Sequence, residues 1–287
     1  MNLRNAPIVV ATDFSTRSDR ALRRATMIAK QFDASLSLVH VVDDDLPQYL
    51  VKAQMEASRS ILEEAARTIT EMDGVAAQAI VESGDVFSGI LRVSDEVEAR
   101  LIVMGPHRRQ LRDAFIGTTA ERTIAHTRRP VLMTAGVPSA HHDRVLIALG
   151  MDEASKSAAH RVRDLGLLDR ADIIAMHAFD APAEGMMKRA MSEPEAINHY
   201  VVGEGRRADA DFSAFVAEIR LGAPRRLLLP VHGTAARTIL EAARGQEADL
   251  IVLGTHQKTG IKRFFLGSVA ADVIGEADCD VLVMPNP

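Results

Sequence analysis

The chain repeats itself, and this repeat constrains its fold more than any other feature. Residues 36–43 read LSLVHVVD and residues 173–180 read IIAMHAFD, so that His40 and His177 lie 137 positions apart. Residues 9–12 (VVAT) match residues 146–149 (LIAL) at the same offset. Matches that keep their order over a whole chain indicate a duplicated structural unit.

Later matches keep the order but widen the offset. Residues 100–107 (RLIVMGPH) correspond to residues 249–256 (DLIVLGTH) at offset 149, so the second copy gains twelve residues before that point. Residues 116–133 correspond to residues 266–283 at offset 150, so the first copy lacks one residue in the loop between. We call the two halves copy one and copy two.

The length of 287 residues suits two domains, because one α/β domain takes roughly 100–200 residues. We predict domain 1 at residues 1–137, a linker at 138–143 and domain 2 at 144–287, with an insertion at about 182–224. The insertion mixes a helical pattern with breaks at Pro194, Gly203 and Gly205. It is expected to form two helical pieces around a loop. A plain surface insertion, a lid and a surface for a partner are the alternative roles.

Each copy carries five short runs rich in Val, Ile and Leu, which are typical of buried strands. They are residues 8–12, 36–42, 79–81, 101–104 and 131–134 in copy one, and 145–149, 173–177, 227–229, 250–253 and 281–284 in copy two. Helical periodicity separates them. We therefore predict an α/β fold in which each domain has a parallel sheet, right-handed crossovers and helices on both faces. Such sheets bind ligands at the carboxyl ends of their strands.

Composition narrows the function classes. The formal charge of −5 argues against broad nucleic-acid binding, which needs a basic surface.

No apolar run reaches about 18 residues and the start MNLRNAPIVV lacks a secretory pattern, so neither a membrane partner nor export is expected. The single cysteine, Cys279, excludes an internal disulfide and suits a reducing compartment. We expect a cytoplasmic protein with Cys279 as a buried structural thiol, a redox role being the alternative.

The first candidate site cluster follows the first strand and reads Ala11-Thr-Asp13-Phe-Ser. The Asp13 carboxylate can accept hydrogen bonds from a ribose hydroxyl or a base. Asp at such a place is also common in turns and helix caps, so that both roles stay open.

The second cluster follows the fourth strand of each copy, at Gly105-Pro-His107 and at Gly254-Thr-His256-Gln257. Glycine lets a backbone approach a ligand closely, although a simple turn also accounts for it. The histidines occupy equivalent positions, and a hydrogen bond within the loop is the favoured role. No group of His, Cys and carboxylate at ligand spacing points to a metal.

The third cluster opens a helix in each copy, at Gly117-Thr118 and at Gly267-Ser268-Val269. Backbone N–H groups and the helix dipole make such a terminus an anion site. The hydroxyls can bind phosphate or cap the helix, and Thr118 with Glu121 has the spacing of a capping box.

Taken in order, IVVATDFSTRSDRAL, LSLVHVVD, VESGDVFSGIL, RLIVMGPH and GTTAERTIAHTRRPVLM resemble one universal stress protein domain. VLIALGMDEASKSAA, IIAMHAFD, DLIVLGTHQKTGIKRFFLGSVAADVI and CDVLVMP resemble a second. The resemblance implies a tandem member of this family, with two open five-stranded parallel sheets of strand order 3-2-1-4-5. It also implies that the domains pair through their last strands as an internal pseudo-dimer; a further homodimer is possible.

The family so resembled divides into members that bind ATP and members that do not. The pattern of the binding members is glycine, two residues, glycine, nine residues, glycine, then Ser or Thr. Copy two has Gly254, Gln257 in place of the second glycine, and Gly267-Ser268 at the expected spacing.

Copy one departs from the pattern differently. It has Gly105, Arg108 at the second glycine and Gly117-Thr118 one residue early. It keeps the family's Asp as Asp13 and an adenine-ribose contact as Val41, which become Gly150 and Ala178 in copy two.

These features predict a stress-response regulator that binds an adenine nucleotide, ATP or AMP, in at least one degenerate site, with Mg²⁺ only as the nucleotide's counter-ion. The alternative is a chaperone-like or interaction protein that captures an unknown protein partner through the pseudo-dimer and the insertion. The chain lacks G-x-x-x-x-G-K-[ST], G-x-S-x-G and H-E-x-x-H, so no dedicated catalysis is expected, slow ATP hydrolysis aside.

Overall fold

The computed structural model describes residues 2–105, 118–136, 138, 140–255 and 266–285. The strands of copy one are β1 (Pro7–Ala11), β2 (Ser35–Val42), β3 (Ala77–Ser83), β4 (Leu101–Met104) and β5 (Val131–Met133). Those of copy two are β6 (Arg144–Ala148), β7 (Asp172–Phe179), β8 (Arg225–Pro230), β9 (Leu250–Gly254) and β10 (Asp280–Met284). Each of the ten predicted strands is present, with bounds that differ from the predicted ones by a few residues.

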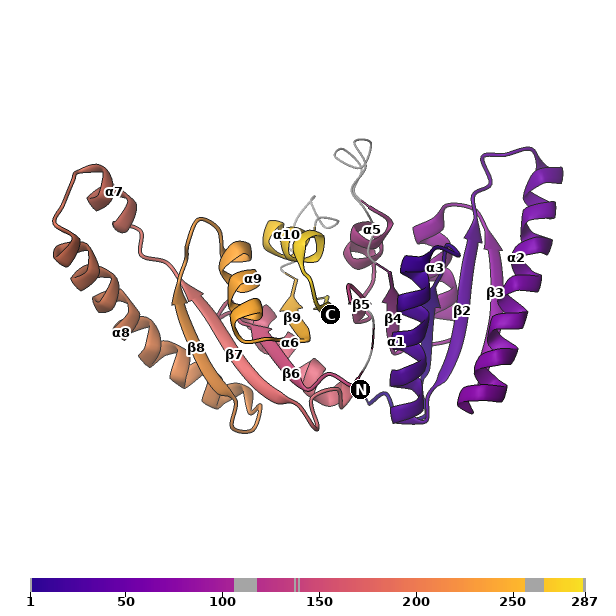
Figure 1. The fold of residues 1–287 in the computed structure, drawn as a ribbon, viewed down its shortest axis with the longest axis horizontal. Coiled ribbons are helices and arrows are strands. Elements are labelled where there is room, and N and C mark those ends of the chain that lie inside the picture. The colour runs from indigo at the N-terminus through magenta and orange to yellow at the C-terminus, as the bar shows by residue number, and fades with distance from the viewer. Residues whose placement is uncertain (1, 106–117, 137, 139, 256–265, 286–287) are drawn as a thin grey trace.

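Within the described part of the chain, these strands form a single sheet. Their order is β3-β2-β1-β4-β5-β10-β9-β6-β7-β8 (Figure 1). Each half has the order 3-2-1-4-5, and every pairing inside a half is parallel. The predicted α/β architecture and the pseudo-dimer through the last strands are confirmed.

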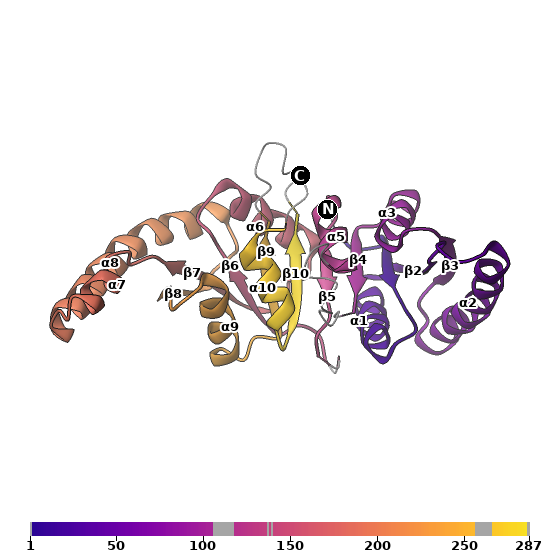
Figure 2. The same ribbon diagram turned by 90° about the horizontal axis from the view of Figure 1, so that it is seen from above.

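The helices of copy one are α1 (Thr16–Phe32), α2 (Gln48–Thr68), which continues into a short π-helical turn (Ile69–Asp73), α3 (Val86–Glu96) and α5 (Thr119–His126). Those of copy two are α6 (Glu153–Leu165), α7 (Glu184–Arg189), α8 (Pro194–Ile219), α9 (Ala235–Gly245) and α10 (Ser268–Glu276). Helices lie on both sides of the strands in each half (Figure 2).

Each face of the sheet has its own hydrophobic core. One core joins side chains of α1, α2, α6 and α8 with one side of the strands, and the other joins those of α3, α5, α9 and α10 with the opposite side. Both are largely aliphatic, as a chain with 4% aromatic residues requires.

The insertion forms two helical pieces, as predicted, but the expected glycine break is wrong. Helix α8 begins at Pro194, where the fixed φ of proline suits a first helical position. It then continues without interruption through Gly203 and Gly205. A Cβ on Gly205 would lie 3.3 Å from the ring of Phe179, so this glycine lets α8 approach β7. The cost of a glycine inside a helix, about 1 kcal/mol relative to alanine, does not end a helix that packs along a sheet.

The two halves meet at β5 and β10, which pair in antiparallel fashion. Val131 lies opposite Val283, and Met133 lies opposite Val281. All four side chains are buried. This pairing removes both inner sheet edges, and each of the two cores contains residues of both domains.

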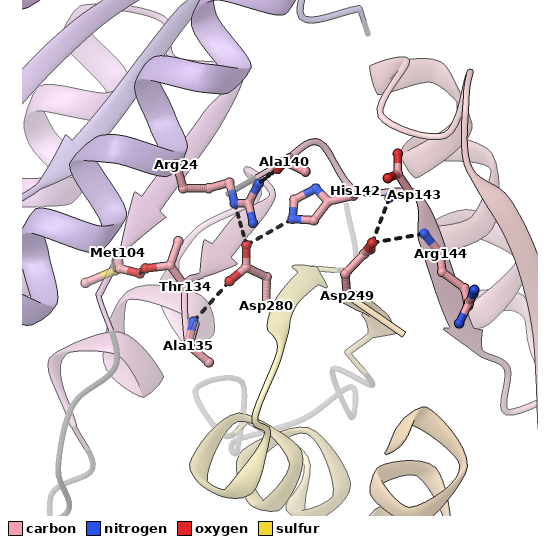
Figure 3. A network of polar contacts seen from close by, with 10 residues as sticks. All are labelled: Arg24, Met104, Thr134, Ala135, Ala140, His142, Asp143, Arg144, Asp249 and Asp280. Atoms are coloured by element: carbon pink, nitrogen blue, oxygen red, sulfur yellow. Dashed lines mark hydrogen bonds and ion pairs between the residues drawn. The ribbon is translucent and has the colours of Figure 1, made fainter. Parts of the chain in front are cut away.

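A buried carboxylate fastens the same junction (Figure 3). Asp280, 2% exposed, forms an ion pair with Arg24 of α1, with 2.7 Å between Oδ2 and Nε. The ring of His142 approaches the same oxygen at 2.9 Å through Nε2, and the backbone N–H of Ala135 donates to the other oxygen at 3.1 Å. Arg24 also donates to the carbonyl of Ala140. One side chain of copy two therefore holds α1, the end of β5 and the connecting segment of the chain.

The equivalent corner on the other side lacks this carboxylate. Arg161 of α6 stands 137 residues after Arg24, and it donates to the backbone carbonyls of Arg128 and Pro285. Burial lowers the pKa of its guanidinium. Pro130 occupies the place of Asp280 in copy one. The two sides of the junction are therefore related in backbone, but Arg24 has a buried carboxylate as its partner and Arg161 has no carboxylate at the equivalent position.

Replacing Asp280 with Asn should destabilise the whole chain, because Arg24 would keep its charge in a buried place without a counter-charge. We expect a loss of roughly 3–5 kcal/mol in the free energy of unfolding, measured by urea denaturation. The matched control is Asp278→Asn, two residues away, where an exposed pair with Arg244 predicts a loss below about 1 kcal/mol. Equal losses for the two variants would contradict a structural role for Asp280.

Cys279 lies beside this network and is partly buried. Burial, with a contribution from the neighbouring Asp280, raises the pKa of its thiol to about 12. The structure thus favours the interpretation as a structural thiol, because the thiolate is the reactive form.

The native chain should therefore react slowly with iodoacetamide, and the rate should stay low between about pH 7 and about pH 9.5, below the raised pKa of the thiol. In urea the same thiol should titrate near its ordinary pKa of about 8.5 and react faster as the pH rises. Native labelling that follows the curve of the unfolded chain would contradict this assignment.

Candidate functional site

Each half carries a cleft at the carboxyl ends of its strands. The copy-one cleft encloses about 250 Å³ and the copy-two cleft about 420 Å³. Each lies over the first strand of its domain, β1 or β6, which has the second strand on one side and the fourth on the other. At this point the chain reverses the direction in which strands are added, which is where open α/β sheets bind ligands.

The copy-one cleft receives most of its predicted residues. Ala11, Asp13, Val41 and Gly105 all line it. Val41 is 8% exposed and packs against Gly89 of α3, where a Cβ would come to 2.8 Å from a Val41 methyl. The missing side chain at Gly89 is what allows α3 to close this wall.

Asp13 lines the cleft and also takes part in the turn before α1. Its Oδ1 accepts a hydrogen bond from the backbone N–H of Ser15, the residue that caps α1, at 3.0 Å. Burial raises the pKa of the Asp13 carboxyl, but hydrogen bonds from Ser15 and Ser18 outweigh it and hold this pKa below its ordinary value. The cleft is therefore lined by an ionised carboxylate at neutral pH.

Copy two keeps the backbone of this turn and loses the carboxylate. Met151 repeats the positive φ of Phe14, 58° against 59°, and Asp152 caps α6 as Ser15 caps α1. Gly150 takes the place of Asp13, and its N–H donates to the hydroxyl of Ser155 at 2.8 Å. The local fold thus survives without the side chain that would recognise hydroxyl groups.

His40 and His177, which in the sequence serve only to align the copies, both line the clefts. Each ring donates from Nδ1 to a backbone carbonyl at 2.8 Å, that of Thr12 in copy one and that of Leu149 in copy two. With Nδ1 as the donor, Nε2 of a neutral ring remains an acceptor. The only sequence signal for this role is the shared spacing within LSLVHVVD and IIAMHAFD.

The glycines after the fourth strands serve the contact between strand and helix. A Cβ on Gly105 would lie 2.9 Å from the backbone oxygen of Arg17, and one on Gly254 would lie 3.1 Å from Cβ of Ala158. Both glycines also line their clefts. They let the N-terminal part of α1 or α6 come close to the sheet, which narrows the floor of each cleft.

The two predicted phosphate-binding helices differ at their first turns. Thr118 is 6% exposed and forms a complete capping box with Glu121, so its hydroxyl is engaged in capping α5. In copy two the N-cap of α10 is Gly267, with no side-chain hydrogen bond at the cap. Ser268 is exposed and lines the copy-two cleft together with Gly267 and Val269. The Thr118 hydroxyl thus caps its helix, whereas the N-cap of α10 has no side-chain hydrogen bond.

An ion pair and a cation–π contact lie beside the copy-one cleft. Arg122 of α5 pairs with Asp85 at 3.1 Å and lies 3.8 Å above the ring of Phe87, which ties α5 to the start of α3. Burial raises the pKa of Asp85, but hydrogen bonds from Ser88 and the charge of Arg122 lower it below its ordinary value. Copy two has Asp272 and Thr234 at the paired positions, which cannot form this bridge.

Several predicted site residues lie outside the described part of the chain. They are His107 and Gly117 of copy one and His256 and Gln257 of copy two. Their proposed roles remain predictions.

The structure brings together three acidic side chains that lie outside the three candidate site clusters. The carboxylates of Asp43, Asp44 and Asp45 lie within 4.8 Å of one another and are exposed. They are absent from the walls of the copy-one cleft, and we assign them no ligand.

The two halves also match a known family of proteins. The sequence model of the universal stress protein family matches residues 5–135 and again residues 141–285. The chain belongs to the universal stress protein family. A universal stress protein of Mycolicibacterium smegmatis is 26% identical over 303 aligned positions, covering 96% of each chain. One of Methanocaldococcus jannaschii is 33% identical over 144 positions, covering 48% of this chain and 78% of that protein.

Solved structures share the fold over the whole chain. The crystal structure of a universal stress protein from Archaeoglobus fulgidus covers 99% of this chain with a TM-score of 0.70 at 18% identity. At this identity the likeness shows the fold alone. Among the described helices of this universal stress protein, none combines the length and apolar character needed to cross a membrane.

The packing around the cleft glycines predicts how far the free energy of unfolding falls when each glycine is replaced by alanine. Gly105→Ala should lower the free energy of unfolding by about 1–3 kcal/mol, because the new methyl group meets backbone that must shift. Gly267→Ala should change it by less than about 1 kcal/mol, since, apart from the residues next to it in the chain, no atom of the described residues lies within 4 Å of the place that its Cβ would take. Urea denaturation of the two variants measures both, and an equal loss in each would contradict the packing described for Gly105.

Proposed function

We propose that this universal stress protein is a regulatory protein that binds an adenine nucleotide, ATP or AMP, in the copy-two cleft. One observation carries the proposal. The first turn of α10 presents Gly267 and an exposed Ser268 to the cleft, with no side-chain hydrogen bond at its N-cap. The N–H groups and dipole of such a turn favour a phosphate.

The rest of the cleft fits the other end of a nucleotide. Its walls include Met176 of β7, Ile239 of α9 and Leu253 of β9. Apolar walls with a few polar groups at one end are typical of small-molecule sites. A base would lie against the apolar walls while the phosphates reach α10, with Mg²⁺ accompanying the phosphates as counter-ion.

Copy one is the weaker candidate even though it retains Asp13. Its cleft is the smaller one, and the hydroxyl of Thr118 is engaged in the capping box. We therefore propose one nucleotide per chain. The role is one of binding and signalling in the cytoplasm rather than dedicated catalysis, since the chain lacks the catalytic motifs G-x-x-x-x-G-K-[ST], G-x-S-x-G and H-E-x-x-H.

Thermal unfolding with and without saturating ATP and Mg²⁺ tests the proposal. A ligand at 100 times its Kd stabilises its domain by about 2.7 kcal/mol, which corresponds to several degrees in Tm. Ser268→Glu should abolish the shift, because the new carboxylate repels phosphate. The same substitution does not weaken α10, since an acidic side chain is favourable at a helix N-terminus.

Thr119→Glu is the matched control. Thr119 is the first residue of α5 and lines the copy-one cleft, as Ser268 is the first residue of α10 and lines the copy-two cleft. This variant should keep the full ATP shift. The absence of any shift in the wild-type chain at millimolar ATP would refute nucleotide binding, and loss of the shift only in Thr119→Glu would move the site to copy one.

A second candidate function is capture of partly unfolded proteins through the insertion. It is favoured by the exposed apolar side chains of the α7–α8 segment, with Met186 61%, Met191 92% and Val202 44% exposed. If this function is present, the chain should reduce light scattering by aggregating reduced insulin, and Met186→Glu with Met191→Glu should remove the effect. Equal protection by wild type and variant would exclude this surface.

A further inference from the structure

Copy two lacks the carboxylate that copy one offers to a ligand. Gly150 stands where copy one has Asp13, yet the surrounding turn is kept. A nucleotide in the copy-two cleft would therefore bring two ribose hydroxyl groups into a place where residue 150 supplies no side-chain acceptor. Hydroxyl groups that leave water without a partner lower affinity.

Another carboxylate lines the copy-two cleft from the neighbouring strand. Asp180 directly follows β7, and it appears in the wall of the cleft beside Gly150, His177 and Ala178. Its counterpart in copy one is Asp43, 137 residues earlier, and Asp43 is not part of the copy-one cleft. The acidic side chain of the cleft thus follows the first strand in copy one and the second strand in copy two.

A single residue difference explains why Asp180 is available. In copy one, Oδ1 of Asp43 accepts a hydrogen bond from the backbone N–H of Asp45 at 3.1 Å, which holds the carboxylate in its own turn. The position of Asp45 in copy two is Pro182. Proline has no backbone N–H, so this turn cannot form and the Asp180 side chain is not held there.

The charges around Asp180 are consistent with an available acceptor. It also borders a second cleft of about 620 Å³ between α7 and the start of α9, which contains Lys188 and Arg237. Lys188 pairs with Glu184 at 2.6 Å and Arg237 pairs with Glu241 at 2.7 Å, each within its own helix. The two cations that border this cleft are thus engaged by other carboxylates, while Asp180 is exposed.

We propose that Asp180 replaces the missing first-strand carboxylate of copy two and accepts hydrogen bonds from the vicinal hydroxyls of the ligand's ribose. The inference rests on the proposed function, since it assigns the sugar end of the same site. It further implies that a sugar in the copy-two cleft lies close to β7, the second strand of its domain. A sugar bound by Asp13 in the copy-one cleft would lie farther from the equivalent strand, β2.

The test uses the full chain and a photoreactive nucleotide, 2-azido-ATP, with labelled peptides assigned to copy one or copy two by mass spectrometry. Labelling is competed with ATP and with 2′,3′-dideoxy-ATP, which has the same base and phosphates but no ribose hydroxyls. In the wild-type chain, ATP should compete at copy two about tenfold better than the dideoxy compound, as expected for hydrogen bonds to a charged acceptor.

Asp180→Asn should reduce the competition by ATP at copy two about tenfold and leave that by dideoxy-ATP unchanged, because only ATP carries the hydroxyls that the carboxylate would bind. Asp43→Asn, the matched control at the equivalent position of copy one, should alter neither. If Asp180→Asn keeps the wild-type preference for ATP over dideoxy-ATP, the assignment of Asp180 is wrong while nucleotide binding stands. If ATP does not compete for labelling of wild-type copy two at all, the proposed function fails and this inference fails with it.

Discussion

The antiparallel pairing of β5 with β10, held in register by the buried carboxylate of Asp280, is the contact on which the rest of the molecule depends. It turns two five-stranded sheets into one and closes the edge that each domain would otherwise expose. Asp280 joins Arg24 to the end of β5 across this contact. Because Arg24 lies on α1 and the first turn of α1 borders the copy-one cleft, the junction also fixes one wall of that cleft.

Duplication followed by divergence explains why the two clefts differ. The strand order and the paired histidines are repeated in both copies, because they maintain the fold. Several residues that would meet a ligand are not repeated. Copy one keeps Asp13 but engages Thr118 in a capping box, whereas copy two frees Ser268 and loses the first-strand carboxylate. The turn after the first strand keeps its backbone in both copies, with φ of 59° at Phe14 and 58° at Met151, so the side chain at residue 13 or 150 can change without altering this turn.

The fold could be predicted in detail because its signals are periodic and occur twice. All ten strands, the strand order and the two helical pieces of the insertion followed from apolar runs, the repeat and the family resemblance. The site was less predictable, since its parts depend on contacts between distant segments. Nothing near Asp280 in the sequence indicates its pairing with Arg24, and nothing near Gly205 indicates that its α-carbon lies close to the ring of Phe179. The capping box at Thr118, in contrast, is a local pattern that the sequence predicts.

In the proposed function, one half of this universal stress protein binds a nucleotide and the other supports it. Isothermal titration calorimetry of the chain with ATP and Mg²⁺ is the decisive experiment, because it counts sites. The predicted result is saturable binding of about one nucleotide per chain. Among the described residues of the two clefts, the helix N-terminus without a side-chain cap belongs to the copy-two cleft. Two equivalent sites per chain would contradict the division of roles between the copies, and no binding heat at millimolar nucleotide would contradict the site itself.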